Sequence, residues 1–500
     1  MSSGNESRRA WTWLGFVLLA GLLLFQAFAY YSRLTLSLGP RVIFQPWALQ
    51  HGLLMYENLA DQHSPLMPLV LSALVPVIPD GLRLAKIVLV VLVTLTTLLT
   101  FLAARRYAGR AAGIAAAFVF VLWSPTFGFG KLWHETFLAP LYLLWLLCYD
   151  PTAPHRSTRR LLLLGLLGGV TVLFKQHAVL VFAAFVLWNA LTIWLAQRSL
   201  LKIVRETGVL CAAAAAPVVA LAAYHYAQAG TLANLFYWTT TFNLVSGYRT
   251  LAALSPTTAQ ISGLVSAGVL MPAALLGLIE LKRQGDKRWL VLGWGLVLLV
   301  CASLTVYPRF AFFHFQPAAP ILAFLTAFVA GYALRRRDTG AAALPRAWFP
   351  AGVVVGIAAF WLVTAGAAYW RDFQSDAPRK IWEYTDLIPV AGEIRQRIGP
   401  TDGFSILPDD EATANLYYLT RCPPPKFWTF TYPWYMLDRV KRQVLTTLQV
   451  HAPAWIVYFP GRDEIEKRAP EIIAYMQGHY QRDVPLHWAQ GEGWLYKRVP

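Results

Sequence analysis

The chain has 500 residues, of which 57% are hydrophobic and 14% charged. Soluble globular proteins are about 45–50% apolar, so this composition excludes an ordinary soluble protein and predicts a polytopic membrane protein. The formal net charge of +17 does not indicate a nucleic-acid partner, because the basic residues cluster in short loops between apolar stretches. There they anchor and orient a membrane protein.

The first apolar stretch follows Arg8 and Arg9 and lacks the small residues of a cleavage site, so we predict an uncleaved membrane span. A spanning helix needs about 20 apolar residues. On that basis about eleven spans are predicted, near residues 12–32, 84–104, 111–130, 136–149, 161–174, 178–196, 207–227, 260–281, 289–306, 317–334 and 347–369. Segment 66–78 is interrupted by Pro68 and Pro76 and is interpreted as re-entrant or interfacial. The count is open by two.

The loops on one side of these spans are all basic. They comprise residues 105–110, 155–160, 197–205, 282–288 and 335–337, and they share the side of the N-terminal arginines. The positive-inside rule assigns this side to the cytoplasm. An odd number of spans then places the C-terminal region outside.

From residue 370 onward the composition becomes that of a soluble domain. Helical patterns cover residues 386–398, 409–419, 434–450 and 463–479, and strand patterns cover 403–407, 454–459 and 494–498. Such alternation predicts a small α/β domain. The predicted fold class is a membrane all-α bundle of about eleven helices, residues 1–370, followed by an extracytoplasmic α/β domain, residues 371–500.

Loop 33–68, on the predicted outer side, concentrates Glu57, Asp61 and His63 in a chain otherwise rich in leucine, valine and alanine. On a helix, residues four apart share a face, so Glu57 and Asp61 would lie together. Neighbouring carboxylates can split their proton affinities and leave one ionised as a general base. A solvated acidic loop accounts for the same residues, and the sequence alone leaves both interpretations open.

Further polar residues fall at the predicted outer ends of spans. Lys175, Gln176 and His177 form a tight turn between two apolar halves. This cluster suits an anion, with the lysine as a point charge and its neighbours as donors. Arg309 and His314, set among aromatic residues, are similar in kind. Snorkelling of the lysine and an aromatic-belt anchor at the arginine are the alternatives.

His134 and Glu135 lie between two predicted spans and would point apart on a helix. They are therefore predicted to be a buried, hydrogen-bonded pair and not a metal site. Glu135 and the other outer polar residues are candidates to line one outward-facing cavity. The four cysteines give no disulfide framework and no metal-ligand spacing. The sequence names no cofactor with certainty and leaves a divalent cation open.

Residues 46–66 read PWALQHGLLMYENLADQHSPL. Together with the Lys175-Gln176 turn, segment 309–316 and the order of spans followed by a soluble domain, this run resembles the polytopic GT-C glycosyltransferases. That group includes protein O-mannosyltransferases and aminoarabinose transferases, and the resemblance covers most of the chain. Two positions depart from the group's pattern. Asn58 replaces an aspartate, and Gln45 stands where relatives often carry an acid.

The resemblance implies a bacterial inner-membrane enzyme that transfers a hexose or pentose from a polyprenyl-phosphate carrier. The acceptor would be a hydroxyl of a glycan, lipid or protein on the outer face, attacked with inversion, and membrane lipids are further partners. Asp61 would be the general base, with Glu57 as its alternate or orienting partner. The implied phosphate contacts are Lys175, Arg309 and His314, and the other implied substrate contacts are His63, Gln176, His177 and Glu135.

Two other classes of protein can carry charges at membrane depth. A lipid or sugar transporter or flippase would arrange them around a cavity, but transporters often show inverted repeats and paired broken helices, and the sequence shows neither. A non-catalytic scaffold would leave the outer polar residues scattered. A membrane glycosyltransferase is therefore the preferred function, and a transporter or flippase is the alternative.

Overall fold

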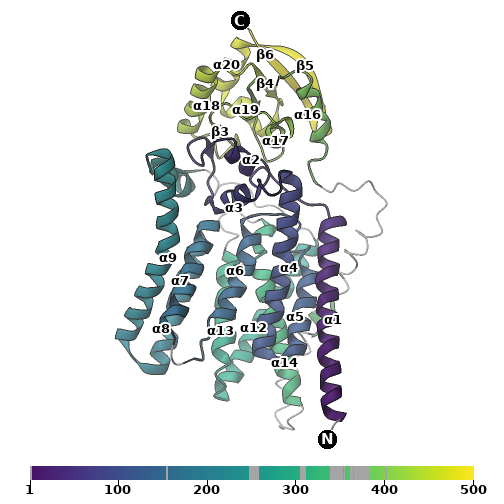
Figure 1. Ribbon diagram of the computed structural model, residues 1–500, viewed down its shortest axis with the longest axis vertical. Coiled ribbons are helices and arrows are strands. Elements are labelled where there is room, and N and C mark those ends of the chain that lie inside the picture. Colours follow the sequence, from purple (N-terminus) through teal and green to yellow (C-terminus); the bar gives the residue numbers. More distant parts are fainter. Residues whose placement is uncertain are drawn as a thin grey trace. The chain divides into compact units, whose positions relative to one another are not determined.

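The computed structural model describes residues 3–153, 156–246, 258–304, 311–337, 382–399 and 402–499, with a few residues between 353 and 367. The chain divides into two compact units, whose elements are labelled in Figure 1. The first comprises Met1–Leu34, Ile87–Val219 and Ala253–Arg379, and the second comprises Thr35–Lys86, Ala220–Ala252 and Lys380–Pro500. Each unit is therefore assembled from segments that are distant in the sequence.

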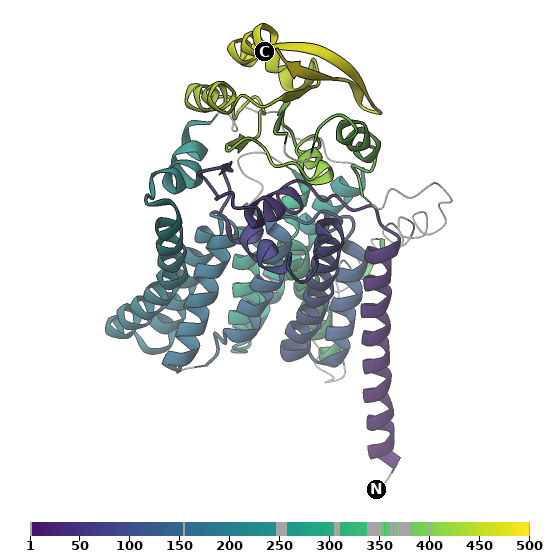
Figure 2. The same cartoon turned by 45° about the horizontal axis from the view of Figure 1, so that its top comes forward.

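Helices of the first unit run side by side in Figures 1 and 2. They are α1 (Ser3–Ser32), α4 (Gly81–Ala108), α5 (Arg110–Trp123), α6 (His134–Cys148), α7 (Thr158–Phe174), α8 (Ala178–Gln197), α9 (Leu200–Ala229), α12 (Thr258–Arg283), α13 (Trp289–Ser303) and α14 (Ala318–Arg337), with α4 beginning and α9 ending in the second unit. Within the described residues, ten predicted spans coincide with these helices, and most of the predicted span 347–369 lies outside that part.

Four helices in the described part of the chain are long and apolar enough to cross a membrane. They are Trp13–Ser32, Gly81–Ala108, Ala178–Gln197 and Leu200–Ala229. Shorter apolar helices of 10–17 residues accompany them at Arg110–Trp123, His134–Cys148, Trp289–Ser303 and Ala318–Tyr332. The chain is a multi-pass membrane protein.

Close packing between α7 and α9 depends on two glycines. Gly165 and Gly169 are four apart on α7 and therefore lie on one face of that helix. A Cβ atom at Gly165 would clash with the backbone oxygen of Leu210, and one at Gly169 would clash with that of Ala214. The two backbones thus approach as they do in other membrane helices with small residues four apart.

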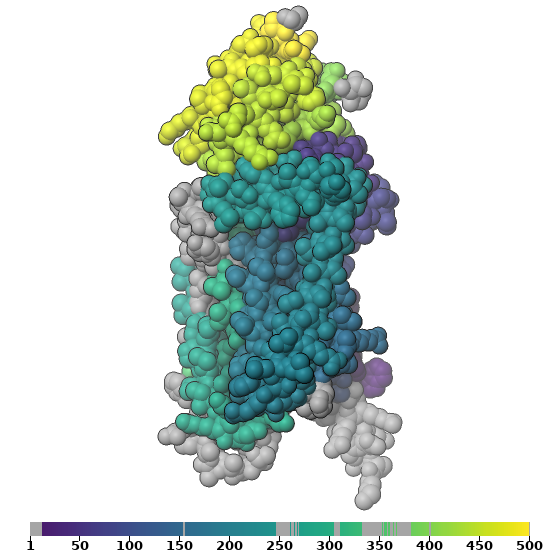
Figure 3. All heavy atoms as spheres, turned by 90° about the vertical axis from the view of Figure 1, so that its left-hand side faces the viewer, coloured from purple at the N-terminus to yellow at the C-terminus, as the bar shows by residue number. Residues whose placement is uncertain are grey.

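Segments of α8 and α9 lie at the surface in Figure 3, and their exposed side chains form an apolar face. On these helices Leu187, Leu195, Leu201 and Val204 are between 55% and 82% exposed. Exposed apolar surface of this kind marks a contact with another protein or with a membrane. In a membrane protein this face suits the acyl chains of the bilayer.

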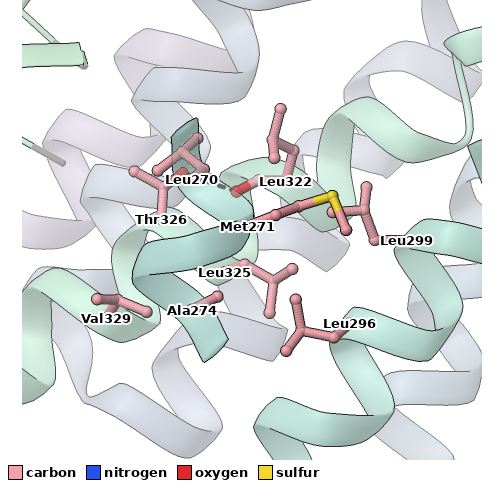
Figure 4. A pocket seen from close by; sticks show the side chains of 9 residues that line it. All are labelled: Leu270, Met271, Ala274, Leu296, Leu299, Leu322, Leu325, Thr326 and Val329. Carbon is pink, nitrogen blue, oxygen red and sulfur yellow. Dashed lines mark hydrogen bonds between the residues drawn. The ribbon is translucent and has the colours of Figure 1, made fainter. Parts of the chain in front are cut away.

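A small cavity lies among α12, α13 and α14 in the same unit (Figure 4). Its lining is apolar apart from Thr326, whose hydroxyl donates to the Leu322 carbonyl oxygen of its own helix. Its volume of about 10 Å³ is near the smallest that holds one water molecule. It is therefore a packing gap and too small for a substrate.

The second unit combines loop 33–68, called here the first loop, with the segment after α9 and the C-terminal region. Its elements before the C-terminal region are α2 (Phe44–Gln50), β1 (Leu59–Ala60), α3 (Leu66–Leu74), α10 (Ala233–Phe236), the π-helical η1 (Tyr237–Thr241) and α11 (Phe242–Val245). With 9 residues, α3 is only about 13 Å long and cannot cross a hydrocarbon core of about 30 Å. Segment 66–78 is therefore not a span.

Four C-terminal strands form one sheet in the described region, in the order β2 (Phe404–Leu407), β4 (Trp455–Tyr458), β6 (Gly491–Arg498) and β5 (Tyr480–Trp488). β2 and β4 are parallel and the other pairs are antiparallel; β5 and β6 form the hairpin drawn in yellow in Figure 2. The predicted strands are present. The sequence analysis missed β5 because Pro485 interrupts its strand pattern. Proline is tolerated at this position because β5 lies at the edge of the sheet.

The C-terminal helices follow the predicted segments with two differences. They are α16 (Leu387–Arg395), α17 (Asn415–Thr420), α18 (Asp438–His451), α19 (Ile465–Arg468) and α20 (Pro470–His479), with a short 3₁₀ turn η5 (Arg462–Glu464). The helix predicted over 463–479 is divided because Ala469, which precedes Pro470, leaves the helical conformation. The helix predicted over 409–419 begins only at Asn415. The predicted domain boundary at residue 370 lies outside the described residues.

Candidate active site

The first loop is not helical around its two carboxylates. Tyr56 has a φ of 67°, and its hydroxyl donates to the His63 carbonyl oxygen over 2.7 Å. Leu59 and Ala60 form β1, which pairs in parallel with β3 (Trp428–Thr429). The prediction that Glu57 and Asp61 share a helix face is therefore wrong. Residues between the two carboxylates form a strand that pairs with the C-terminal region, so the helix that their spacing of four would suit does not form.

Asp61 is the most fully bonded carboxylate of this loop. It is 2% exposed, and its Oδ2 atom accepts from Arg41 Nε at 2.6 Å and from Gln45 Nε2 at 2.9 Å. Its Oδ1 atom accepts from the His63 backbone N–H at 3.0 Å and lies 2.7 Å from His63 Nδ1. The structure thus brings the predicted residues Asp61 and His63 together and adds Arg41, which was not predicted.

The residues around Asp61 keep its carboxylate ionised. Burial opposes ionisation, but Arg41 and His63 outweigh it, and the pKa of Asp61 lies well below its usual range. Burial also opposes the charge of Arg41, yet Asp61 keeps the pKa of this guanidinium raised. An ionised carboxylate with two partners on each oxygen is a strong anchor and a weak proton acceptor.

Both departures from the GT-C pattern are amides that donate hydrogen bonds. Gln45 donates to Asp61, where an acidic side chain would repel that carboxylate. Asn58 accepts from the Leu54 backbone N–H at 2.8 Å and donates to the Lys426 carbonyl oxygen at 2.7 Å. A carboxylate at position 58 could not make the second bond, because an ionised carboxylate only accepts. The two amides therefore stabilise the conformation of the first loop through their hydrogen bonds.

Glu57 has different partners from Asp61. Its Oε2 atom accepts from Asn234 Nδ2 at 2.6 Å, and its Oε1 atom lies 3.7 Å from His225 Nε2. Asn234 in turn accepts from Arg439 of α18 at 2.9 Å, and the Arg439 guanidinium stacks 3.8 Å from the ring centre of Tyr237. Within the described residues, Glu57 Oε1 is buried and accepts no hydrogen bond. Of the four carboxylate oxygens of Glu57 and Asp61, this atom is the one that accepts no hydrogen bond from the described residues.

A cavity of about 30 Å³ is lined in part by His225, the residue that faces Glu57 Oε1. It lies between the first loop, α3 and the end of α9, all in the second unit. Its apolar lining is interrupted by four polar side chains, Tyr56, Tyr224, His225 and Gln228. That volume holds about two water molecules or a small polar group. The first loop therefore has a fully bonded carboxylate, a less bonded one and a mostly apolar cavity beside His225.

A second cluster lies in the first unit and joins three predicted residues. Glu135, at the start of α6, forms an ion pair with Lys175 and a close contact with His314 Nδ1, and Lys175 Nζ lies 3.2 Å from the same imidazole atom. Glu135 is completely buried, and His314 and Lys175 are 7% and 3% exposed. The lysine charge is therefore balanced by Glu135 within the cluster.

Four other predicted residues have different outcomes. Gln176 and His177 form the turn between α7 and α8, as predicted, and their carbonyl oxygens accept from the backbone N–H groups of Val179 and Leu180. Arg309 lies outside the described residues. His134, predicted to be a buried structural residue, is 1% exposed and bonds the Phe174 carbonyl oxygen at 2.8 Å.

Sequence reasoning missed Arg41, His225, Asn234 and Arg439. A signal existed for Arg41, because a basic residue on the side opposite the basic loops runs against the charge rule and calls for a partner. The other three contact Glu57 only through tertiary packing. No group of three or more His, Cys, Asp or Glu side chains that could hold a metal ion occurs in the described part of the chain.

Solved structures with the same fold span almost the whole chain. ArnT from Cupriavidus metallidurans, bound to undecaprenyl phosphate, is 13% identical with a TM-score of 0.60, over 96% of this chain and 97% of that one. AglB, an oligosaccharyltransferase from Archaeoglobus fulgidus in complex with an inhibitory peptide and a dolichol-phosphate, is 13% identical with a TM-score of 0.51, over 98% of this chain and 74% of that one.

The arabinofuranosyltransferase AftD from Mycobacteria is 15% identical with a TM-score of 0.51, over 97% of this chain and 40% of that one. No protein-family model matches the chain, and no curated protein matches it by sequence. ArnT, AglB and AftD are GT-C glycosyltransferases. The predicted resemblance is therefore confirmed at the level of the fold, and this chain has the fold of the GT-C membrane glycosyltransferases.

Proposed function

We propose that the protein is a membrane glycosyltransferase that moves a sugar from a polyprenyl-phosphate donor to a hydroxyl group of a glycan, lipid or protein. The fold supports this, since it matches along almost its full length a transferase solved with undecaprenyl phosphate. The apolar face on α8 and α9 suits a donor that is reached from within the bilayer. The carboxylates of the first loop supply the base that such a transfer needs.

The observation that carries the proposal is the contrast between the two carboxylates. Asp61 is ionised and bonded on both oxygens, whereas Glu57 Oε1 accepts no hydrogen bond from the described residues. We assign Glu57 as the general base and Asp61 as the residue that fixes Arg41, Gln45 and His63 around it. His63 is a substrate contact on this proposal. Asp61 takes the role of orienting partner that the resemblance implied for Glu57, so the expected roles of the two carboxylates are exchanged.

The proposed reaction is a direct displacement. The acceptor oxygen forms a bond to the anomeric carbon, and the bond from that carbon to the phosphate oxygen breaks. The electron pair leaves with the carrier phosphate, and the acceptor proton passes to Glu57 Oε1. Attack from the side opposite the leaving phosphate inverts the anomeric configuration. A positioned carboxylate contributes about 10²–10⁴-fold to such a step.

The leaving phosphate needs positive charge near its oxygens. We assign this role to Lys175 and Arg309, with Gln176 and His177 as further contacts. A lysine ammonium has three donors, and within the described residues the ion pair of Lys175 with Glu135 engages one of them. Another of these donors can serve a phosphate oxygen. Glu135 and His314 hold the ammonium in position and also reduce its net attraction for an anion.

The proposed setting is a bacterial inner membrane with the N-terminus in the cytoplasm and the C-terminal α/β domain outside. The basic loops support this orientation, because they fall on one side of the predicted spans. About eleven spans are proposed, with the first loop on the outer face beside the C-terminal domain. Transfer then takes place on that face, where the acceptor is found.

The test is a transfer assay on purified protein in lipid nanodiscs. Undecaprenyl-phosphate-linked glucose, mannose and arabinose are offered separately, together with an extract of bacterial lipids and glycans. The proposal expects release of free undecaprenyl phosphate and appearance of the sugar on an acceptor with one of these donors. A protein that moves the donor between leaflets of a vesicle without releasing its sugar would be a flippase, and that result contradicts the proposal.

A further inference from the structure

Two polar atoms that face each other in the second unit lack hydrogen-bond partners among the described residues. They are Glu57 Oε1 in the first loop and His225 Nε2 in the last turns of α9, 3.7 Å apart. Both atoms are buried, and His225 is 7% exposed. Buried polar atoms are hydrogen-bonded in the large majority of cases. A facing pair without hydrogen bonds is therefore a candidate site for a group that lies beside the two atoms and bonds to both.

The two side chains are held in this arrangement by their surroundings. Asn234 fixes the other oxygen of Glu57, and Arg439 fixes Asn234. The Tyr56 ring packs edge-on against the His225 imidazole, with ring centres 5.8 Å apart. The facing atoms are therefore prepared before any ligand arrives, which reduces the ordering that binding requires.

Chemistry and size select the kind of group that fits. A carboxylate oxygen accepts, and a neutral imidazole with its proton on Nε2 donates. A hydroxyl group satisfies both at once, because it has one donor and two acceptor lone pairs. The adjoining cavity of about 30 Å³ includes His225, Tyr56 and Gln228 in its lining and has room for such a group to enter.

We propose that Glu57 and His225 together bind the hydroxyl group of the sugar acceptor. This inference rests on the proposed glycosyltransferase function and adds His225 to its acceptor site. The hydroxyl donates its hydrogen to Glu57 Oε1 and accepts from His225 Nε2–H. Its second lone pair then forms the bond to the anomeric carbon while its proton moves to Glu57. His225 keeps its own proton and acts as the positioning residue that points the hydroxyl at the base.

The test compares His225→Phe, which removes the donor, with His225→Gln, whose amide can donate in its place. Tyr226→Phe is the matched control, since Tyr226 is the next residue on α9 and is 57% exposed. The acceptor is varied by diluting the lipid and glycan extract, and the donor is the undecaprenyl-phosphate-linked sugar that the wild-type protein uses. Binding of undecaprenyl phosphate to each variant reports whether the variant is folded.

His225→Phe is expected to lower kcat/KM for the acceptor by about 100-fold and to leave the donor KM within about twofold of wild type. His225→Gln should recover about tenfold of the loss. An unchanged acceptor kcat/KM in His225→Phe would overturn the hydroxyl site while leaving the transferase proposal intact. An equal loss in the Phe and Gln variants would also overturn it. A wild-type protein that transfers no sugar from any donor overturns both proposals.

Discussion

Replacing Asp61 with asparagine tests the role of this residue as an anchor. The substitution removes the charge that balances Arg41. It also replaces one of the two carboxylate oxygens, which accept from Arg41, Gln45 and His63, with an amide nitrogen that can only donate. Leaving one partner of a buried ion pair without its counter-charge costs about 3–5 kcal/mol. For a unit of about 200 residues this lowers the melting temperature by roughly 6–20 °C.

The assay is thermal denaturation of the purified protein in detergent, followed by tryptophan fluorescence. The double variant Arg41→Met, Asp61→Asn is the internal control, because it removes both charges and should be more stable than Asp61→Asn alone. A single variant that melts within about 2 °C of the wild type would refute the ion-pair reasoning.

The stabilisation that Asp61 contributes depends on pH in a defined direction. Asp61 has a lowered pKa in the folded protein, so its stabilisation is present above the pKa of an unfolded aspartate, about 4, and is lost as the pH falls below it. The difference in melting temperature between wild type and Asp61→Asn should therefore be present throughout pH 5 to 8. It should shrink below about pH 4, and a difference that grows there would contradict the assignment.

Three further predictions concern other parts of the molecule. Lys175→Met should weaken undecaprenyl phosphate binding by about 10–100-fold, whereas Glu135→Gln should strengthen it, because the ammonium loses its counter-charge; unchanged binding in both removes the phosphate role. Arg439→Ala should lower the transfer rate about fivefold, because Asn234 loses the residue that holds it against Glu57. Arg442 is exposed on the same helix, and Arg442→Ala should leave the rate unchanged. Equal rates in the two variants would exclude positioning by Arg439. Gly169→Ala should lower the melting temperature by several degrees because its Cβ meets the backbone of α9, while Gly208→Ala, with open space around it, should not; equal melting temperatures would rule out the close helix contact.

The helices of the membrane part could be predicted from the sequence because each coincides with a continuous apolar segment, although several are shorter than a full span. The same reasoning located β2, β4 and β6, whose local patterns suffice. It failed at β5, where Pro485 hides an edge strand. It also failed between Tyr56 and Asp61, where a left-handed turn and pairing with Trp428 replace the helix that the spacing suggested.

The candidate site was predictable only in part, for a related reason. Asp61, Glu57 and His63 stood out as polar residues in an apolar chain. Glu135, Lys175 and His314 were candidates because charges at membrane depth are costly, but their direct contact with one another was not predicted. The partners that separate the two carboxylates could not be found this way. His225, Asn234 and Arg439 come from three other segments, and only the fold brings them to Glu57.

The measurement that decides the role of Glu57 is the rate of sugar transfer by Glu57→Gln, compared with Asp61→Asn. Glu393→Gln is the control for a half-buried carboxylate on α16. Glutamine keeps the shape of Glu57 and the contact that Asn234 makes, but it cannot take a proton. We predict a loss of about 10²–10⁴-fold in kcat, with unchanged undecaprenyl phosphate binding and a fully active Glu393→Gln. A Glu57→Gln variant that transfers sugar at the wild-type rate would contradict the account.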